Sequence, residues 1–349
     1  MGCVCTQDNH QLELKNEFSQ NPNDIEEKIL QNKDLLNALI KLQAIIKGRF
    51  YRNNAKKESS KEESITFKYI TTEKIDQNEL QELFDKYPPL DDGIEVEVRS
   101  PAEFSNKVIY FGEWDKVNNL RHGRGIQIWP DGAKFLGCWK NGKACGKGKL
   151  IHSDGDIYEG DWKDDKPWGY GKYLHLDGTK YEGEWKDDKQ HGKGKEIWPD
   201  GTSYEGEYVE GKKQGKGIFK WHDKSMYEGE FLNSNIHGKG KYIFADGREY
   251  DGEWFNNKLQ GKGRFKWPDG RVYTGEYLND KKDGKGLFEW PDGKKYNGEW
   301  KNGKQHGIGE YYSVTDKKWR KGYWENGVRK KWLDEDNNEN KENNKNNQE

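Results

Sequence analysis

The sequence predicts an all-β repeat array, an elongated antiparallel meander of hairpins, preceded by a small α-helical neck. A unit of 23 residues recurs through residues 108–332, and ring-bearing and polar residues alternate within each unit. The chain is also rich in glycine and in rings, since its 349 residues include 42 Gly, 15 Trp and 19 Tyr. A single hairpin cannot bury its apolar face, so neighbouring units are expected to stack.

The repeat is recognised by the pattern Tyr-x-Gly-x-Trp. The first step between its glycines is 25 residues, the next seven are 23 and the last is 24. An aromatic residue stands two positions after the glycine in all ten units. The glycines are Gly112, Gly137, Gly160, Gly183, Gly206, Gly229, Gly252, Gly275, Gly298 and Gly322.

Within a unit the alternation has a period of two, which indicates strands. Tyr181, Gly183 and Trp185 fall on one face, and the two carboxylates between them fall on the other. Glycine between rings lets the next ring lie over the backbone. Polar turns such as 163–166 and Pro-Asp-Gly turns such as 268–270 separate the strands. The expected repeat core comprises Tyr158, Gly160, Trp162, Tyr181, Gly183, Trp185, Tyr250, Gly252, Trp254, Trp267, Trp290 and Trp300.

These residues resemble the MORN repeat family, whose pattern is Tyr-x-Gly-x-Trp, a polar loop, Gly-Lys-Gly and Pro-Asp-Gly. The resemblance implies an elongated, twisted β-meander that serves as a structural or targeting scaffold, often at membranes or in the ciliary cytoskeleton. Some family members self-associate, so a homodimer is one expectation. The sequence departs from the pattern at the turn residue Lys224, at Arg320 in place of tyrosine, at Cys138 in place of an acid, and over 314–317.

The first six residues match an acylation signal. Gly2 after Met1, with Thr6, fits the N-myristoylation pattern, and Cys3 and Cys5 offer sites for palmitate. One acyl chain binds membranes reversibly, so a second gives stable anchoring. Unmodified cysteines are the alternative. No apolar run is long enough to span a membrane and no secretory signal is present. We expect the cytoplasmic face of a plasma or ciliary membrane, in a reducing compartment.

Residues 24–56 are expected to form a basic amphipathic helix. Its centre is similar to the IQ motif, which implies binding of calmodulin or a calmodulin-like protein through an apolar stripe and polar contacts. Two other uses of the helix are packing against the first hairpin and resting on anionic lipid. The candidate calmodulin-binding residues are Leu42, Gln43, Ile46, Lys47, Gly48, Phe50 and Arg52.

A short helix is expected to start at the capping box 76–79 and to end before Tyr87-Pro88-Pro89, with a strand over 94–98 after it. The predicted domains are an acylated flexible N-terminus over 1–22, a helical neck with the IQ-like motif and lead-in strand over 23–100, the MORN array over 101–333, and a disordered acidic, Asn-rich tail over 334–349. Residues 334–349 contain six acidic and two basic residues and lack any apolar one.

No catalytic motif is recognised, and neither a cofactor nor a metal is expected. The Gly-Lys-Gly triplets lie in strands instead of opening a helix, so they do not form a phosphate-binding loop. Charge also argues against nucleic-acid binding, because the array's net charge of +7 is spread over 233 residues. In four units, the residue immediately before Gly-x-Gly is a histidine, and turn packing accounts for these histidines better than metal ligation. They are His122, His191, His237 and His306.

The sequence therefore predicts a non-enzymatic, membrane-tethered scaffold or adaptor. Its array would present a binding surface, and its neck helix would recruit calmodulin. Membrane lipid and other cytoskeletal or ciliary proteins are the further expected partners. The alternatives are a structural component of the cilium axoneme, similar to radial-spoke MORN proteins, and an accessory subunit of an enzyme in another chain.

Overall fold

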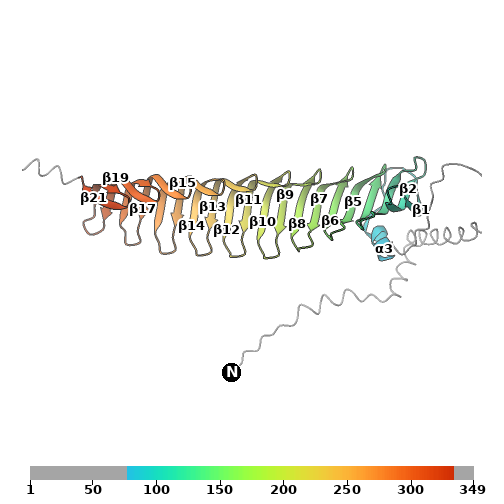
Figure 1. Ribbon diagram of the computed structural model, residues 1–349, viewed down its shortest axis with the longest axis horizontal. Helices are drawn as coiled ribbons and strands as arrows, with labels where there is room; N and C mark the ends of the chain where they lie inside the picture. The colour runs from blue at the N-terminus through green and yellow to red at the C-terminus, as the bar shows by residue number, and fades with distance from the viewer. Residues whose placement is uncertain (1–76, 334–349) are drawn as a thin grey trace, which may run out of the picture. The chain divides into compact units, whose positions relative to one another are not determined.

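A computed structural model describes residues 77–333. This part of the chain contains one α-helix and 21 strands, and the strands belong to a single antiparallel sheet in which successive strands form hairpins (Figure 1). The chain divides into two compact units, one up to Trp168 and one from Gly169. No helix in the described residues is long and apolar enough to cross a membrane. The all-β repeat array is therefore confirmed.

The first unit contains helix α3 and six complete strands. Its elements are α3 (Gln77–Lys86), β1 (Val96–Glu103), β2 (Ile109–Asp115), β3 (Arg121–Ile128), β4 (Lys134–Lys140), β5 (Lys143–Ile151) and β6 (Ile157–Lys163). The next strand, β7 (Lys166–Leu174), contains the division between the units.

The second unit continues the meander with hairpins that follow one another along the sheet (Figure 1). Its strands are β8 (Lys180–Lys186), β9 (Lys189–Ile197), β10 (Ser203–Val209), β11 (Lys212–Lys220), β12 (Met226–Leu232), β13 (Asn235–Ile243), β14 (Glu249–Phe255), β15 (Lys258–Lys266), β16 (Val272–Leu278), β17 (Lys281–Glu289), β18 (Lys295–Lys301), β19 (Lys304–Ser313), β20 (Lys318–Glu325) and β21 (Val328–Trp332).

Most of the two-residue hairpin turns also bond to the preceding repeat. Asn256 and Asn257 both have positive φ, of 47° and 66°, which is the type I′ conformation that suits a tight hairpin. The Asn257 N–H donates to the Ile236 carbonyl at 2.9 Å, and the Asn257 side chain accepts from the Ile236 N–H at 2.8 Å. Asp280 and Leu259 repeat the same pair of bonds one unit later. These bonds connect consecutive hairpins on the side of the sheet where these turns lie.

Glycines in paired strands bring the backbones and rings into close contact. Gly252 on β14 is opposite Gly263 on β15, and a methyl group placed on Gly252 would lie only 2.5 Å from the Gly263 Cα atom. The same methyl group would lie 2.6 Å from the Tyr250 hydroxyl oxygen. The steric reason for the repeated glycine is therefore as the sequence predicts.

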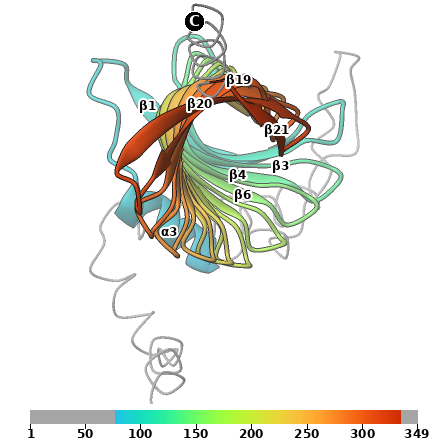
Figure 2. The same cartoon turned by 90° about the vertical axis from the view of Figure 1, so that its left-hand side faces the viewer.

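Helix α3 lies against one face of the first hairpins (Figure 2). Strand alternation places the buried Tyr and Trp ladder on the opposite face. Leu80, Leu83 and Phe84 pack against apolar residues of β2 to β4, and Cys138 is part of this cluster. Cys138 replaces an acid with a small apolar side chain in this cluster, whereas the equivalent acid of the first repeat, Glu113, is buried but paired with Arg124 at 2.7 Å. The helix follows the sequence prediction, and the lead-in strand β1 extends beyond the predicted residues 94–98 to Glu103.

Candidate binding surface

The core of the array is a ladder of tyrosines and larger rings packed edge to face. The Tyr250 ring lies 5.1 Å from Trp254 at 88°, and 5.3 Å from Tyr277 of the next repeat at 87°. These are favourable arrangements for aromatic pairs. The Tyr250 hydroxyl donates to the Glu253 carbonyl at 2.9 Å, and Trp254 Nε1 donates to the Gly240 carbonyl at 3.1 Å. Burial raises the pKa of Tyr250, so its hydroxyl remains a donor.

Most rings of the expected repeat core lie in this ladder. The buried members are Tyr158, Trp162, Tyr181, Trp185, Tyr250, Trp254 and Trp300. In the second unit, the glycines Gly183 and Gly252 meet the opposite strand as described above. Gly160 is paired with Gly148 in the first unit. Trp267 and Trp290 are placed differently, because they lie just beyond their strands and are only half-buried.

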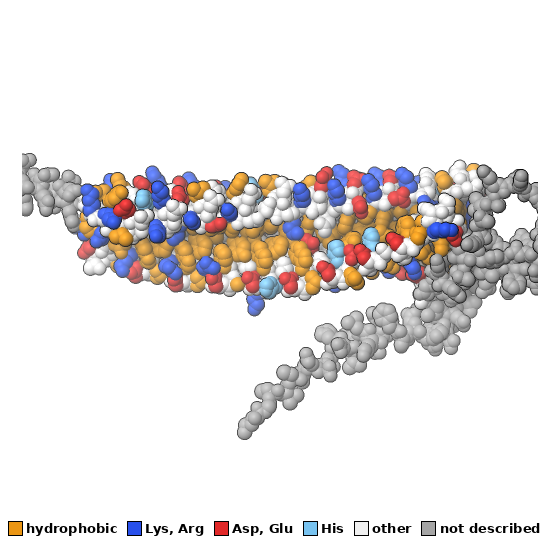
Figure 3. All heavy atoms as spheres, in the orientation of Figure 1, with side chains coloured by type: hydrophobic (Ala, Val, Ile, Leu, Met, Phe, Trp, Pro, Cys, Tyr) orange, Lys and Arg blue, Asp and Glu red, His pale blue; other side chains and the backbone are white. Residues whose placement is uncertain are grey.

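Trp267 and Trp290 belong to a second row of rings, which we call the aromatic face. Its neighbouring rings lie between 4.4 and 6.3 Å apart. Figure 3 shows hydrophobic side chains as a band between rows of charged ones in the second unit. The aromatic face comprises Phe219, Trp221, Tyr242, Phe244, Phe265, Trp267, Phe288, Trp290 and Tyr311.

Two lysines at equivalent repeat positions lie over rings next to this face. Lys213 Nζ is 4.9 Å from the Trp198 ring centre and forms an ion pair with Glu196 at 2.9 Å. Lys282 Nζ is 4.5 Å from the Phe288 ring centre. Burial, and secondarily the positive charge of Arg271, lower the pKa of Lys282 to about 8. Sequence reasoning missed these cations, because lysine is common throughout the repeats.

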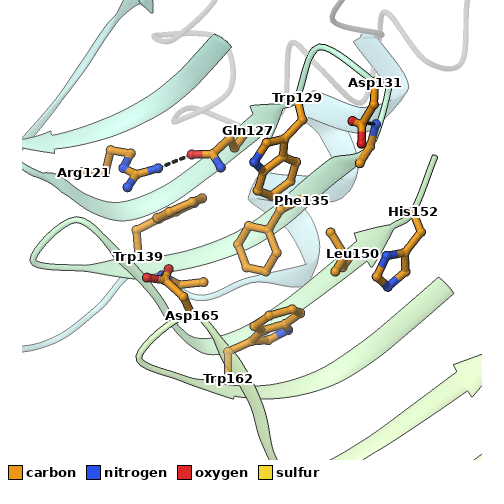
Figure 4. Close-up of a pocket in the computed structure, with 12 residues that line it drawn as sticks. Arg121, Gln127, Trp129, Asp131, Phe135, Trp139, Leu150, His152, Trp162 and Asp165 are labelled. Atoms are coloured by element: carbon orange, nitrogen blue, oxygen red, sulfur yellow. Dashed lines mark hydrogen bonds between the residues drawn. The ribbon is translucent and has the colours of Figure 1, made fainter. Parts of the chain in front are cut away.

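The first unit has an aromatic groove of about 410 Å³ (Figure 4). Arg121 lies at one end, with its guanidinium carbon 4.3 Å from the Trp139 ring centre, and it donates to Gln127 and to the Gly142 carbonyl. Burial lowers the pKa of Arg121. The groove therefore offers rings and one cation to a ligand. Its other lining residues include Trp129, Asp131, Phe135, His152, Trp162 and Asp165.

In several repeats, the side chain before Gly-x-Gly accepts a hydrogen bond from the hairpin turn of the next repeat. The Asn279 N–H donates to Gln260 Oε1 at 3.2 Å, and the Asn302 N–H donates to Asp283 Oδ2 at 3.1 Å. In the first unit, the Asn141 N–H donates to His122 Nδ1 at 3.4 Å. The contact to His122 supports the turn-packing interpretation, whereas His237 Nδ1 and His306 Nδ1 are buried without a hydrogen-bond partner in the described residues. Among residues 77–333, no three His, Cys, Asp or Glu side chains come together as a metal site.

The polar residue before the second ring also has a structural contact. Glu184 Oε1 accepts the Lys193 N–H at 2.9 Å, across a register shift between Gly183 and Trp185. Gly192 has a positive φ of 58°, and a side chain there would collide with the Glu184 carboxyl group. The exposed carboxylate therefore stabilises the bulge in addition to facing solvent.

The remaining predicted sites lie outside the described residues. These are the acylation residues Gly2, Cys3 and Cys5, together with the whole IQ-like motif over 42–52. The acidic segment 334–349 is also outside them.

The described geometry defines an antiparallel repeat protein in which each unit is one ring-bearing hairpin. The MORN repeat family model matches nine stretches that together exceed half of the chain. The chain therefore belongs to the MORN repeat family. The matched residues are 110–134, 135–157, 158–180, 181–203, 204–226, 227–247, 250–270, 273–295 and 296–316.

Solved structures resemble the chain only distantly, and none of the curated proteins compared with it matches. The TCP domain of Drosophila melanogaster SAS-4 in complex with a proline-rich motif of Ana2 has 15% identity and a TM-score of 0.26, covering 55% of this chain and 98% of that one. A mutant TCP10 domain of Danio rerio CPAP has 15% identity and a TM-score of 0.17, covering 58% and 92%. Virginiamycin B lyase of Staphylococcus aureus has 12% identity and a TM-score of 0.14, covering 65% and 84%.

Proposed function

We propose that this MORN repeat protein is a non-enzymatic scaffold, tethered to the cytoplasmic face of a membrane, whose aromatic face binds a protein partner. The observation that carries the proposal is the continuous row of rings in the second unit, most of them half-buried, with Lys213 and Lys282 beside it. Large rings supply much contact area at low cost in conformational entropy, which is why they dominate protein interfaces.

A protein partner suits this face because the rings repeat along the sheet. Phe265 and Trp267 are 4.4 Å apart within one repeat, and Trp267 and Phe288 are 5.6 Å apart between two. A partner segment crossing successive hairpins would meet similar rings at each step. The lysines at two of these steps would select the register of the segment.

The test is capture of partners by the tagged full-length chain. We expect the Trp267→Ala, Trp290→Ala double variant to lose the specific partner, because both rings are half-buried on the aromatic face. The matched control is Val209→Ser with Leu278→Ser, which removes two exposed apolar residues (45% and 47% exposed) from the opposite strand face. Thermal unfolding of each variant verifies that the array is intact. Equal recovery of partners by both double variants would contradict the proposal.

The proposed tether is covalent lipid, myristate on Gly2 with palmitate on Cys3 and Cys5. Two acyl chains give the stable anchoring that one does not. The neck helix is proposed to recruit calmodulin or a calmodulin-like protein through Leu42, Ile46 and Phe50. The same helix could not contact lipid through these side chains at the same time, so calmodulin binding and membrane contact would compete.

A structural role in the cilium axoneme is the second candidate function. Membership of the MORN family favours it, as do the regular backbone hydrogen bonds between neighbouring repeats. Retention of the chain in the detergent-resistant axoneme would favour this role over a lipid tether. An accessory role beside an enzyme in another chain would show as activity that copurifies with the tagged chain. A homodimer would show as a doubled mass in solution.

A further inference from the structure

Lys282, at the start of β17, lies among four rings without an opposite charge. Its Nζ atom is 4.5 Å from the ring centre of Phe288, 4.8 Å from that of Trp300 and 5.0 Å from that of Trp267. Within residues 77–333, no carboxylate forms an ion pair with this amine and no acceptor forms a hydrogen bond with it. A half-buried ammonium group of this kind favours a nearby anion.

The equivalent lysine three repeats earlier has an internal counter-ion. Lys213 pairs with Glu196 at 2.9 Å, and Glu196 also accepts a hydrogen bond from the Tyr208 hydroxyl at 3.1 Å. In the repeat of Lys282 the position of Glu196 is occupied by Phe265. The array therefore satisfies one lysine internally and leaves the other for an acid from elsewhere.

A path of rings connects Lys282 with the end of the described chain. Phe288 lies 4.5 Å from Trp290, Trp290 lies 6.3 Å from Tyr311, and Tyr311 lies 6.5 Å from Trp332 on β21. The guanidinium carbon of Arg329 is 4.0 Å from the Trp332 ring centre. The path therefore has a cation at each end, and the described chain ends one residue after Trp332.

The acidic segment 334–349 starts at this point and has the complementary charge, with six acidic residues against two basic ones. Strands β17 and β21 are four strand spacings apart in the meander, which corresponds to roughly 19 Å. Sixteen extended residues reach roughly 50 Å. A segment joined so closely to its site has an effective concentration on the order of millimolar, which favours even a weak contact.

We propose that the acidic segment 334–349 docks along the ring path from Trp332 toward Lys282 and supplies the carboxylate that pairs with the Lys282 amine. The inference rests on the proposed function in one respect, because the docked segment would cover part of the aromatic face and so compete with the partner. It would act as a built-in competitor that a tighter-binding partner must displace. Screening by salt would weaken the docking.

The test is zero-length carbodiimide cross-linking of the full-length chain, with mass spectrometry to locate the new amide bonds. We expect an amide between Lys282 and an acidic residue of 334–349 at about 20 mM sodium chloride, and severalfold less of it at about 500 mM. A variant with all six segment acids changed to their amides should lose the link. The same variant should show severalfold faster acetylation of Lys282 by a water-soluble reagent, with Lys213 as the unchanged internal control.

Absence of the Lys282 link, with equal Lys282 acetylation in the two chains, would overturn the proposal. Mixing isotopically light and heavy chains identifies the occupant, because a link between a light and a heavy chain would mean a second copy and would also overturn it. Thermal unfolding checks that the array is folded in both chains, and loss of the weakly docked segment should lower the midpoint only slightly. Partner capture by the Trp267 and Trp290 variants is measured separately, so failure of the docking and failure of the proposed function are distinguishable.

Discussion

Changing Gly252 to alanine tests the close packing on which the array depends. Alanine in an ordinary strand is more stable than glycine by roughly 0.5–1 kcal/mol, because glycine loses more backbone entropy on folding. At Gly252 the new methyl group would lie 2.5 Å from the Gly263 Cα atom and 2.6 Å from the Tyr250 hydroxyl oxygen. Normal contact requires the paired strands to separate by about 1 Å, and overpacking of this kind costs ~1–3 kcal/mol. We therefore expect Gly252→Ala to destabilise the array by about 2 kcal/mol, with the opposite sign to an ordinary strand.

The matched control is Gly303→Asn. Gly303 has a positive φ of 82° with no atom within 4 Å of an added Cβ atom, and Asn257 occupies the same turn position in another repeat at 66°. The control should therefore change stability by less than about 1 kcal/mol. The assay is urea unfolding followed by circular dichroism, with hydrogen exchange of residues 249–266, because repeat arrays need not unfold in one step. An unchanged or higher midpoint for Gly252→Ala would refute the packing argument.

Three further predictions follow from single contacts. Glu184→Ala should lower stability by about 0.5–1.5 kcal/mol in urea unfolding, because the bond to the Lys193 N–H is lost. The control Glu205→Ala, at an exposed position, should change stability by no more than about 0.5 kcal/mol. Equal effects of the two variants would contradict the role of Glu184 in the bulge. Lys224→Gly should raise the thermal midpoint slightly, because Lys224 has a strained φ of 73°, and a fall would show that its side chain stabilises the turn. A peptide of residues 35–57 should bind calmodulin in titration calorimetry, with or without calcium, and Gln43→Ala should weaken it; the absence of heat from a soluble peptide in both conditions would exclude the interaction.

The repeated local pattern made the hairpins predictable. The spacing of Tyr181, Gly183 and Trp185 predicts the strand, the buried face and the steric need for glycine, and the structure confirms all three. These properties depend only on neighbouring residues and on the next repeat. Alternation also places Glu184 on the polar face, but it does not reveal the bulge that brings the Lys193 N–H to its carboxylate.

Contacts between distant residues could not be predicted in the same way. Helix α3 reaches the array through pairs such as Glu79 with Lys134 at 2.7 Å and Glu82 with Lys149 at 3.3 Å. Cys138 was the one sequence signal of this packing, because most other repeats have an acidic residue at the equivalent position. The half-buried setting of Trp267 was also missed, since period-two alternation gives it the same face as Phe265 but does not show that the strand ends at Lys266.

The central claim, a scaffold held at a membrane by its acylated N-terminus, is tested most directly by one fractionation measurement. Tagged full-length chain and its Gly2→Ala variant are expressed with an alkyne analogue of myristate, and the share of each in the membrane pellet is measured. We expect the natural sequence to carry the label and to pellet with membranes, and the Gly2→Ala chain to lose both, because palmitate on Cys3 and Cys5 requires the membrane contact that myristate provides. Equal pelleting of the two chains, or an unlabelled natural chain, would contradict the account.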